Sequence, residues 1–110
     1  MTDDPTLTNP ELYRTIFEND LVRVLNYHDR PGDFTAPHRH PDSVMITLSS
    51  FSRRVSTGGR EVDLQIDAGQ VRWVAAQEHV GENTGDTPTH VIFVELKQGS
   101  RSGDALGPTA

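Results

Sequence analysis

The segment Gly32–His40 reads GDFTAPHRH and ends in two histidines, His38 and His40, that are separated by one residue. Successive side chains of a β-strand point to opposite faces, so His38 and His40 share one face if this segment is a strand. Two imidazoles in this arrangement can bind one metal ion, and a third ligand must come from another strand. His79 lies in a second segment with strand character, His79–Thr84, which reads HVGENT. We therefore predict that the three histidines form one metal site.

Length, cysteine content and charge narrow the class of protein. A chain of 110 residues fits one domain. The chain has no cysteine, which excludes disulfides and thiolate metal sites. The formal net charge is −6 and the basic residues are scattered. Binding to nucleic acid or to an anionic membrane needs a basic patch, so we expect neither partner.

The two ends differ in composition from the body. Residues 1–10 are rich in Thr, Asp and Pro, and residues 98–110 form a tail rich in Gly, Ser and Pro. We expect both ends to be flexible and the folded body to span residues 11–97. The first ten residues lack the basic and apolar regions of a signal peptide, and no apolar run reaches the about 20 residues of a membrane span. These features predict a cytoplasmic protein.

The body reads as short strands separated by turn residues. Gly58-Gly59 and the stretch of residues 85–88 each predict a hairpin between the strands beside them. Only the stretch Asn9–Arg14 could form a helical turn. Short strands with a turn every roughly eight to twelve residues are typical of an all-β sandwich or barrel. The expected strands are Tyr13–Glu18, Leu21–Tyr27, Phe34–His40, Val44–Leu48, Phe51–Thr57, Glu61–Ile66, Gln70–Ala75, His79–Thr84 and Thr89–Lys97.

The spacing of these residues resembles the two motifs of the cupin family. The first motif is Gly, five residues, His-x-His, three or four residues, Glu, six residues, Gly. The second is Gly, five residues, Pro-x-Gly, then His, three residues, Asn. The matching residues are Gly32, His38, His40, Gly69, His79 and Asn83. The resemblance covers nearly the whole body and implies a small jelly-roll barrel, also called a double-stranded β-helix.

Several positions depart from the cupin motifs. The Glu of the first motif falls at Val44 or Met45, and its closing Gly is Phe51. In the second motif, Ala75 and Gln77 replace Pro and Gly, and His79 comes one residue earlier than in the broadest form of the motif. The resemblance therefore implies three histidine ligands without the carboxylate. Neutral imidazole suits a divalent ion such as Fe, Zn or Ni, and the identity of the metal stays open.

Further residues are candidates for the surroundings of the metal. His90 and Asn83 lie opposite each other if the last hairpin is symmetric about its turn, so either could be a fourth ligand or a residue that orients the ligands. Asp42 follows the histidine pair by two residues and is a third candidate, although it could equally shape a turn. We expect Val44 and Trp73 to line the wall of the pocket, with a place in the core as the alternative for Trp73.

Three functions fit these features. The first is a metal-dependent enzyme, dioxygenase-like if the metal is iron, that acts on a small organic acid or diketone through open coordination positions. The second is a non-catalytic barrel that binds or senses a metabolite, and the third is an accessory subunit. The histidines could also bind only each other or water. The resemblance further implies a homodimer, with residues 11–27 as the expected contact.

Overall fold

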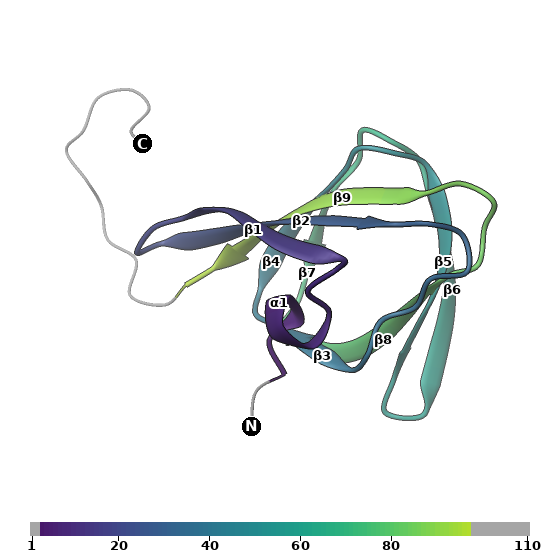
Figure 1. Ribbon diagram of the computed structural model, residues 1–110, viewed down its shortest axis with the longest axis horizontal. Helices are drawn as coiled ribbons and strands as arrows, with labels where there is room; N and C mark the ends of the chain where they lie inside the picture. The colour runs from purple at the N-terminus through teal and green to yellow at the C-terminus, as the bar shows by residue number, and fades with distance from the viewer. Residues whose placement is uncertain (1–2, 98–110) are drawn as a thin grey trace.

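The computed structural model describes residues 3–97, which form two antiparallel β-sheets around a common interior (Figure 1). The elements are α1 (Pro5–Thr8), β1 (Tyr13–Glu18), β2 (Val22–Asp29), β3 (His38–His40), β4 (Ser43–Thr47), β5 (Phe51–Thr57), β6 (Arg60–Ile66), β7 (Val71–Val74), β8 (Gln77–Asn83) and β9 (Thr89–Leu96). One sheet has the order β1-β2-β9-β4-β7 and the other β3-β8-β5-β6, so the predicted all-β jelly-roll class is confirmed.

No helix in this part of the chain is long and apolar enough to cross a membrane. The tail predicted at 98–110 lies outside the described residues.

The core follows from alternation along the strands. On β9, every second residue from Thr89 to Glu95 is buried, and the residues between them are half-buried. β2 runs antiparallel beside β9 and places Leu25 opposite Phe93. Removal of these apolar side chains from water is the main stabilising contribution to such a fold. The buried apolar cluster consists of Tyr13, Leu25, Tyr27, Phe51, Ile66, Val91 and Phe93.

One of the two predicted hairpins is present and the other is not. β5 and β6 pair in register around Gly58 and Gly59, whose φ angles of 55° and 79° favour glycine. β8 instead pairs with β3 and β5, whereas β9 pairs with β2 and β4. The prediction of a hairpin between the last two strands is therefore wrong, because the connection between them crosses from one sheet to the other.

The N-terminal residues of the described chain contact the barrel. α1 is a single turn, and Asp4 caps it by accepting a hydrogen bond from the backbone N–H of Thr6. This turn precedes the stretch Asn9–Arg14, where the sequence suggests one. Asn9 is instead buried, and its Oδ1 accepts a hydrogen bond of 2.7 Å from the backbone N–H of Ala36. This bond ties the entry into β1 to the entry into β3, with α1 lying beside β3 (Figure 1).

Candidate metal centre

Three histidines converge from two neighbouring strands. β3 carries His38 and His40 on its inward face, and β8 places His79 directly opposite His38. One nitrogen from each ring lies within 4.8 Å of those of the other two. The side chains of His38 and His40 are fully buried, and His79 is half-buried. The structure thus brings together the three histidines that the sequence predicts as ligands.

An oxygen atom orients each imidazole at Nδ1. The N···O pairs are His38 with the Ala36 carbonyl at 2.8 Å, His40 with Oε2 of Glu95 at 3.0 Å, and His79 with Oε1 of Gln77 at 2.7 Å. These oxygens accept hydrogen bonds, so we assign the ring proton to Nδ1 in all three rings. Each Nε2 then carries a free lone pair, which is the form of imidazole that binds a metal.

A buried carboxylate lies behind His40. Glu95 is 3% exposed, and its second oxygen, Oε1, forms a salt bridge of 2.8 Å with Nη2 of Arg23. A carboxylate that accepts a hydrogen bond from Nδ1 fixes the tautomer of the ring and raises the basicity of Nε2. No sequence motif marks Glu95. The available signal is the alternation of β9, which places Glu95 on the same face as the apolar core residues Val91 and Phe93.

Burial keeps two of the histidines neutral. Burial lowers the pKa of His38 from 6.5 to about 4. Burial, with a further contribution from the neighbouring His38 and His40, lowers the pKa of His79 from 6.5 to about 3. At neutral pH these nitrogens are therefore available to a metal without competition from protons.

The hydroxyl of Tyr13 also lies close to two of the three histidines. Tyr13 is the first residue of β1, it is 5% exposed, and its Oη lies 3.2 Å from Nε2 of His38 and 3.2 Å from Nε2 of His40. Burial raises the pKa of Tyr13 well above the ordinary value of a phenol, so the hydroxyl keeps its proton at neutral pH in the metal-free protein. No sequence motif marks this tyrosine, because it lies far from the histidine pair in the sequence. The fold of the chain brings the two close together in space.

A cavity of about 300 Å³ adjoins the histidines inside the barrel. His38 and His79 line one part of it, and its walls are largely apolar, with Met45 and Phe93 among them. Arg53 supplies a cationic group in the same cavity. A pocket with apolar walls and a few polar groups of this kind suits a small organic molecule.

Arg53 is held in place by a buried network. Its Nη1 forms a salt bridge of 2.8 Å with Oδ2 of Asp29, and its Nη2 donates to the Tyr27 hydroxyl at 3.1 Å. A Cβ atom at Gly81 would lie 2.5 Å from Nη2 of Arg53. The absence of a side chain at this position therefore leaves the space that the guanidinium occupies.

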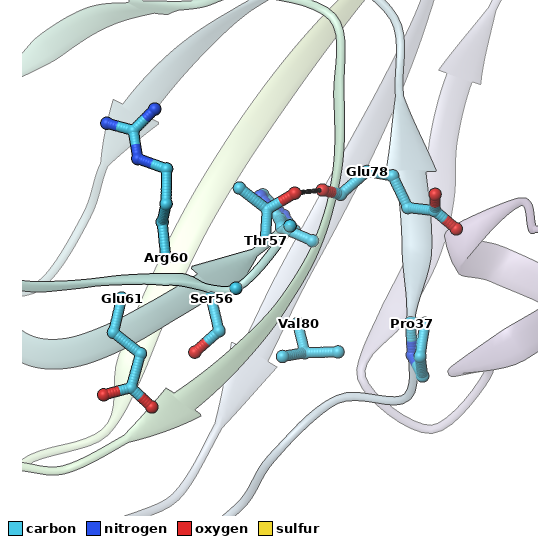
Figure 2. Close-up of a pocket in the computed structure, with 10 residues that line it drawn as sticks. Pro37, Ser56, Thr57, Arg60, Glu61, Glu78 and Val80 are labelled. Carbon is cyan, nitrogen blue, oxygen red and sulfur yellow. Dashed lines mark hydrogen bonds between the residues drawn. The ribbon is translucent and has the colours of Figure 1, made fainter.

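A second depression, of about 550 Å³, lies at the β5–β6 turn and also borders His79. Figure 2 shows that the charged side chains of Arg60, Glu61 and Glu78 point in different directions. The Thr57 hydroxyl donates a hydrogen bond to the Glu78 carbonyl oxygen (Figure 2). Because these charges do not converge on one point, the cavity inside the barrel is the better candidate site.

Solved structures share this architecture. A cupin domain from Bordetella pertussis Tohama I superposes with a TM-score of 0.73 at 25% identity, over 78% of this chain and 92% of the other. The chain has the cupin fold. A predicted oxalate decarboxylase from Thermotoga maritima shares this fold at a TM-score of 0.54 and 20% identity, over 77% of this chain and 79% of its own chain. No family model and no curated protein matches the sequence.

His90 lies on the outer face of this cupin. Its Nε2 is 2.7 Å from Oδ1 of Asn26, and its ring lies edge-on to His28, its partner in the register of β2 and β9. The suggested place opposite Asn83 required a hairpin that the structure does not contain. Alternation along β9 then directs His90 away from the three histidines.

The other two candidate fourth ligands also bind elsewhere. Asn83 is buried, but its Nδ2 donates to Oδ1 of Asp29 at 3.0 Å and so belongs to the network around Arg53. Asp42 is exposed and accepts a hydrogen bond of 2.8 Å from the backbone N–H of Ala76. Neither side chain has a contact with the three histidines among those that the structure describes.

The cavity wall differs in part from the prediction. Met45 packs against the core and lines the cavity, whereas Val44 is not among the lining residues. Adjacent residues of a strand point to opposite faces, and Val44 pairs with Val94 on the side away from the interior. Met45 therefore takes the inward position at which the cupin motif has its Glu. Trp73 does line the cavity, although 58% of its surface is exposed.

Proposed function

We propose that this cupin is a metal-dependent enzyme of small-molecule metabolism, dioxygenase-like, that holds a divalent ion with His38, His40 and His79. The observation that carries this proposal is the convergence of three imidazoles, each with an oxygen at Nδ1, beside a cavity of about 300 Å³. Nitrogen donors of this kind fit iron, zinc or nickel. Iron would supply redox chemistry with O₂, and zinc or nickel would supply Lewis acidity.

We propose a small organic acid or diketone as the substrate. Arg53 and Arg72 both line the cavity and favour an anionic or strongly polar oxygen. Asp29 neutralises part of the charge of Arg53, so Arg53 acts chiefly as a fixed hydrogen-bond donor. The apolar walls contributed by Met45 and Phe93 would hold the carbon skeleton and exclude water from it.

The residues behind the histidines would keep the metal site in shape. Glu95, Gln77 and the Ala36 carbonyl each restrain one ring at Nδ1, which leaves the three Nε2 atoms to bind the metal. Such outer hydrogen bonds typically contribute about 10- to 100-fold to metal affinity or activity. The proposal therefore assigns these groups a positioning role.

Elemental analysis of protein purified without chelator and without oxygen tests the metal site. We expect near-stoichiometric metal in the wild type and a severe loss in His79→Ala, which removes one of three ligands. His28→Ala is the matched control, because His28 is exposed and lies on the outer face with His90. Equal metal content in both variants would reject the site.

The identity of the metal separates the functional alternatives. Bound iron, with O₂ uptake on a diketone, thiol or small acid, would support the dioxygenase-like enzyme. Bound zinc without turnover would favour the alternative, a non-catalytic cupin that binds or senses a metabolite. The cytoplasmic location stays a prediction from the sequence.

A further inference from the structure

The Tyr13 hydroxyl contacts two of the three proposed ligands at once. Its Oη is 3.2 Å from Nε2 of His38 and 3.2 Å from Nε2 of His40. With the ring protons assigned to Nδ1, both nitrogens carry lone pairs. A hydroxyl has one proton, so only one of the two contacts can be an O–H···N hydrogen bond at a time. The other contact brings two lone pairs together, and a shared cation would stabilise both contacts.

These two separations also match the spacing of atoms bound to one ion. Donor atoms that lie about 2.1 Å from a metal are about 3.0 Å apart at right angles and about 3.4 Å apart in a tetrahedron. The value of 3.2 Å for both contacts of Tyr13 falls within this range. We propose that Oη of Tyr13 is the fourth protein ligand of the metal held by His38, His40 and His79. The inference rests on the metal site proposed above.

The charge of the site supports this assignment. Three neutral imidazoles leave the double charge of a divalent ion unbalanced, and Met45 stands where the cupin motif supplies a carboxylate. A phenolate from Tyr13 would contribute the same single negative charge from β1. The phenol proton would pass to solvent when the oxygen binds the metal, as for other protein ligands that bind in their deprotonated form. Tyrosine oxygen is also an established ligand for iron in haem proteins.

Asn9 holds the start of β1, and with it Tyr13, in place. The backbone N–H of Tyr13 donates to the Asn9 carbonyl at 3.0 Å. The Asn9 side chain in turn binds the backbone N–H of Ala36, whose carbonyl orients His38. β1 is thereby positioned against β3 through one buried asparagine. A hydroxyl fixed in this way does not need to move far to become a ligand.

The colour of the iron-loaded protein tests the inference. A phenolate bound to ferric iron absorbs visible light by ligand-to-metal charge transfer, whereas imidazole does not give this band. The probe is Fe²⁺ added under anaerobic conditions and then oxidised in air. We expect a visible band in the wild type and its loss in Tyr13→Phe. The chain has only two tyrosines, so Tyr27→Phe is a complete control and should keep the band.

Zn²⁺ affinity, measured by competition with a chromophoric chelator, is the second readout. We expect Tyr13→Phe to bind Zn²⁺ at least about tenfold more weakly and Tyr27→Phe to bind it as tightly as the wild type. A wild-type protein that binds iron without the band, or a Tyr13→Phe protein that keeps full affinity, would overturn this inference alone. A wild type that binds neither ion would overturn the metal site and the inference together.

Discussion

At Met45, a thioether stands where the cupin motif has a carboxylate. Motif spacing alone leaves Val44 and Met45 as alternatives for this position. The structure decides between them, because Met45 lines the cavity with the histidines and Val44 points to the opposite face of β4. The charge beside the proposed metal therefore depends on whether residue 44 or residue 45 faces the cavity. The spacing of the cupin motif does not determine this.

A carboxylate at position 45 should strengthen metal binding. We expect Met45→Glu to raise Zn²⁺ affinity by roughly tenfold, because the new ligand offsets charge on the ion. The metal-free variant should unfold at a lower temperature than the wild type, because it buries an unpaired carboxylate. Zn²⁺ competition and thermal unfolding with and without metal measure the two effects.

Val44→Glu is the matched control for this experiment. It introduces the same carboxylate one residue earlier, on the face away from the cavity, and should leave Zn²⁺ affinity unchanged. A reversed result, with the gain in Val44→Glu, would mean that β4 has the opposite orientation.

At the level of elements, the sequence predicted the strands better than their partners. The sequence predicts His38 and His79 on two different strands, and the structure pairs these strands, β3 and β8, with the two residues opposite each other. The turn residues between β8 and β9 suggested a hairpin, because Gly and Pro mark any reversal of the chain and do not distinguish a hairpin from a crossing between sheets. The sequence therefore predicts the wrong position for His90, which lies on the outer face of the barrel.

The contribution of β1 could not be predicted from the local pattern. Tyr13 meets His38 and His40 only because Asn9 fixes the entry into β1 against the segment before β3. Such contacts depend on long-range register, which a single sequence does not reveal. Glu95 is an intermediate case, since strand alternation places it inside the barrel but does not show that His40 is its neighbour.

The buried histidines His38 on β3 and His79 on β8 should make the free energy of unfolding depend on pH in the metal-free protein. Burial lowers the pKa of His38 to about 4 and that of His79 to about 3, whereas both titrate near 6.5 in an unfolded chain. As the pH falls from 6.5 to 4, the unfolded state binds protons that the folded state does not. The free energy of unfolding should therefore fall by on the order of a few kcal/mol across this window and stay level above it.

Urea unfolding of chelator-treated protein between pH 7.5 and 4.5 measures this dependence. His79→Gln should reduce the slope, because it removes one of the two buried bases. His28→Gln should preserve the slope, because His28 is exposed in the folded state. A wild-type protein of constant stability between pH 6.5 and 4.5 would contradict the assignment of these histidines as buried and neutral.

At the scale of the whole molecule, β1 forms an edge of the five-stranded sheet. All of its residues after Tyr13 are exposed, including Ile16 at 49% and Phe17 at 39%. An edge strand offers unpaired backbone N–H and C=O groups that can pair with a second chain. These features support the homodimer predicted through residues 11–27, and the contact would involve the strand that presents Tyr13 to the histidines.

If the chain forms a homodimer through β1, we expect Ile16→Arg to convert it into a monomer, because the charged side chain would have to be buried in the interface. Sedimentation equilibrium across a range of protein concentrations measures the change. Val62→Arg is the matched control, since Val62 is exposed to a similar extent, 48%, but lies on β6 in the other sheet. A wild type that sediments as a monomer, or a dimer that persists in Ile16→Arg, would remove β1 as the contact.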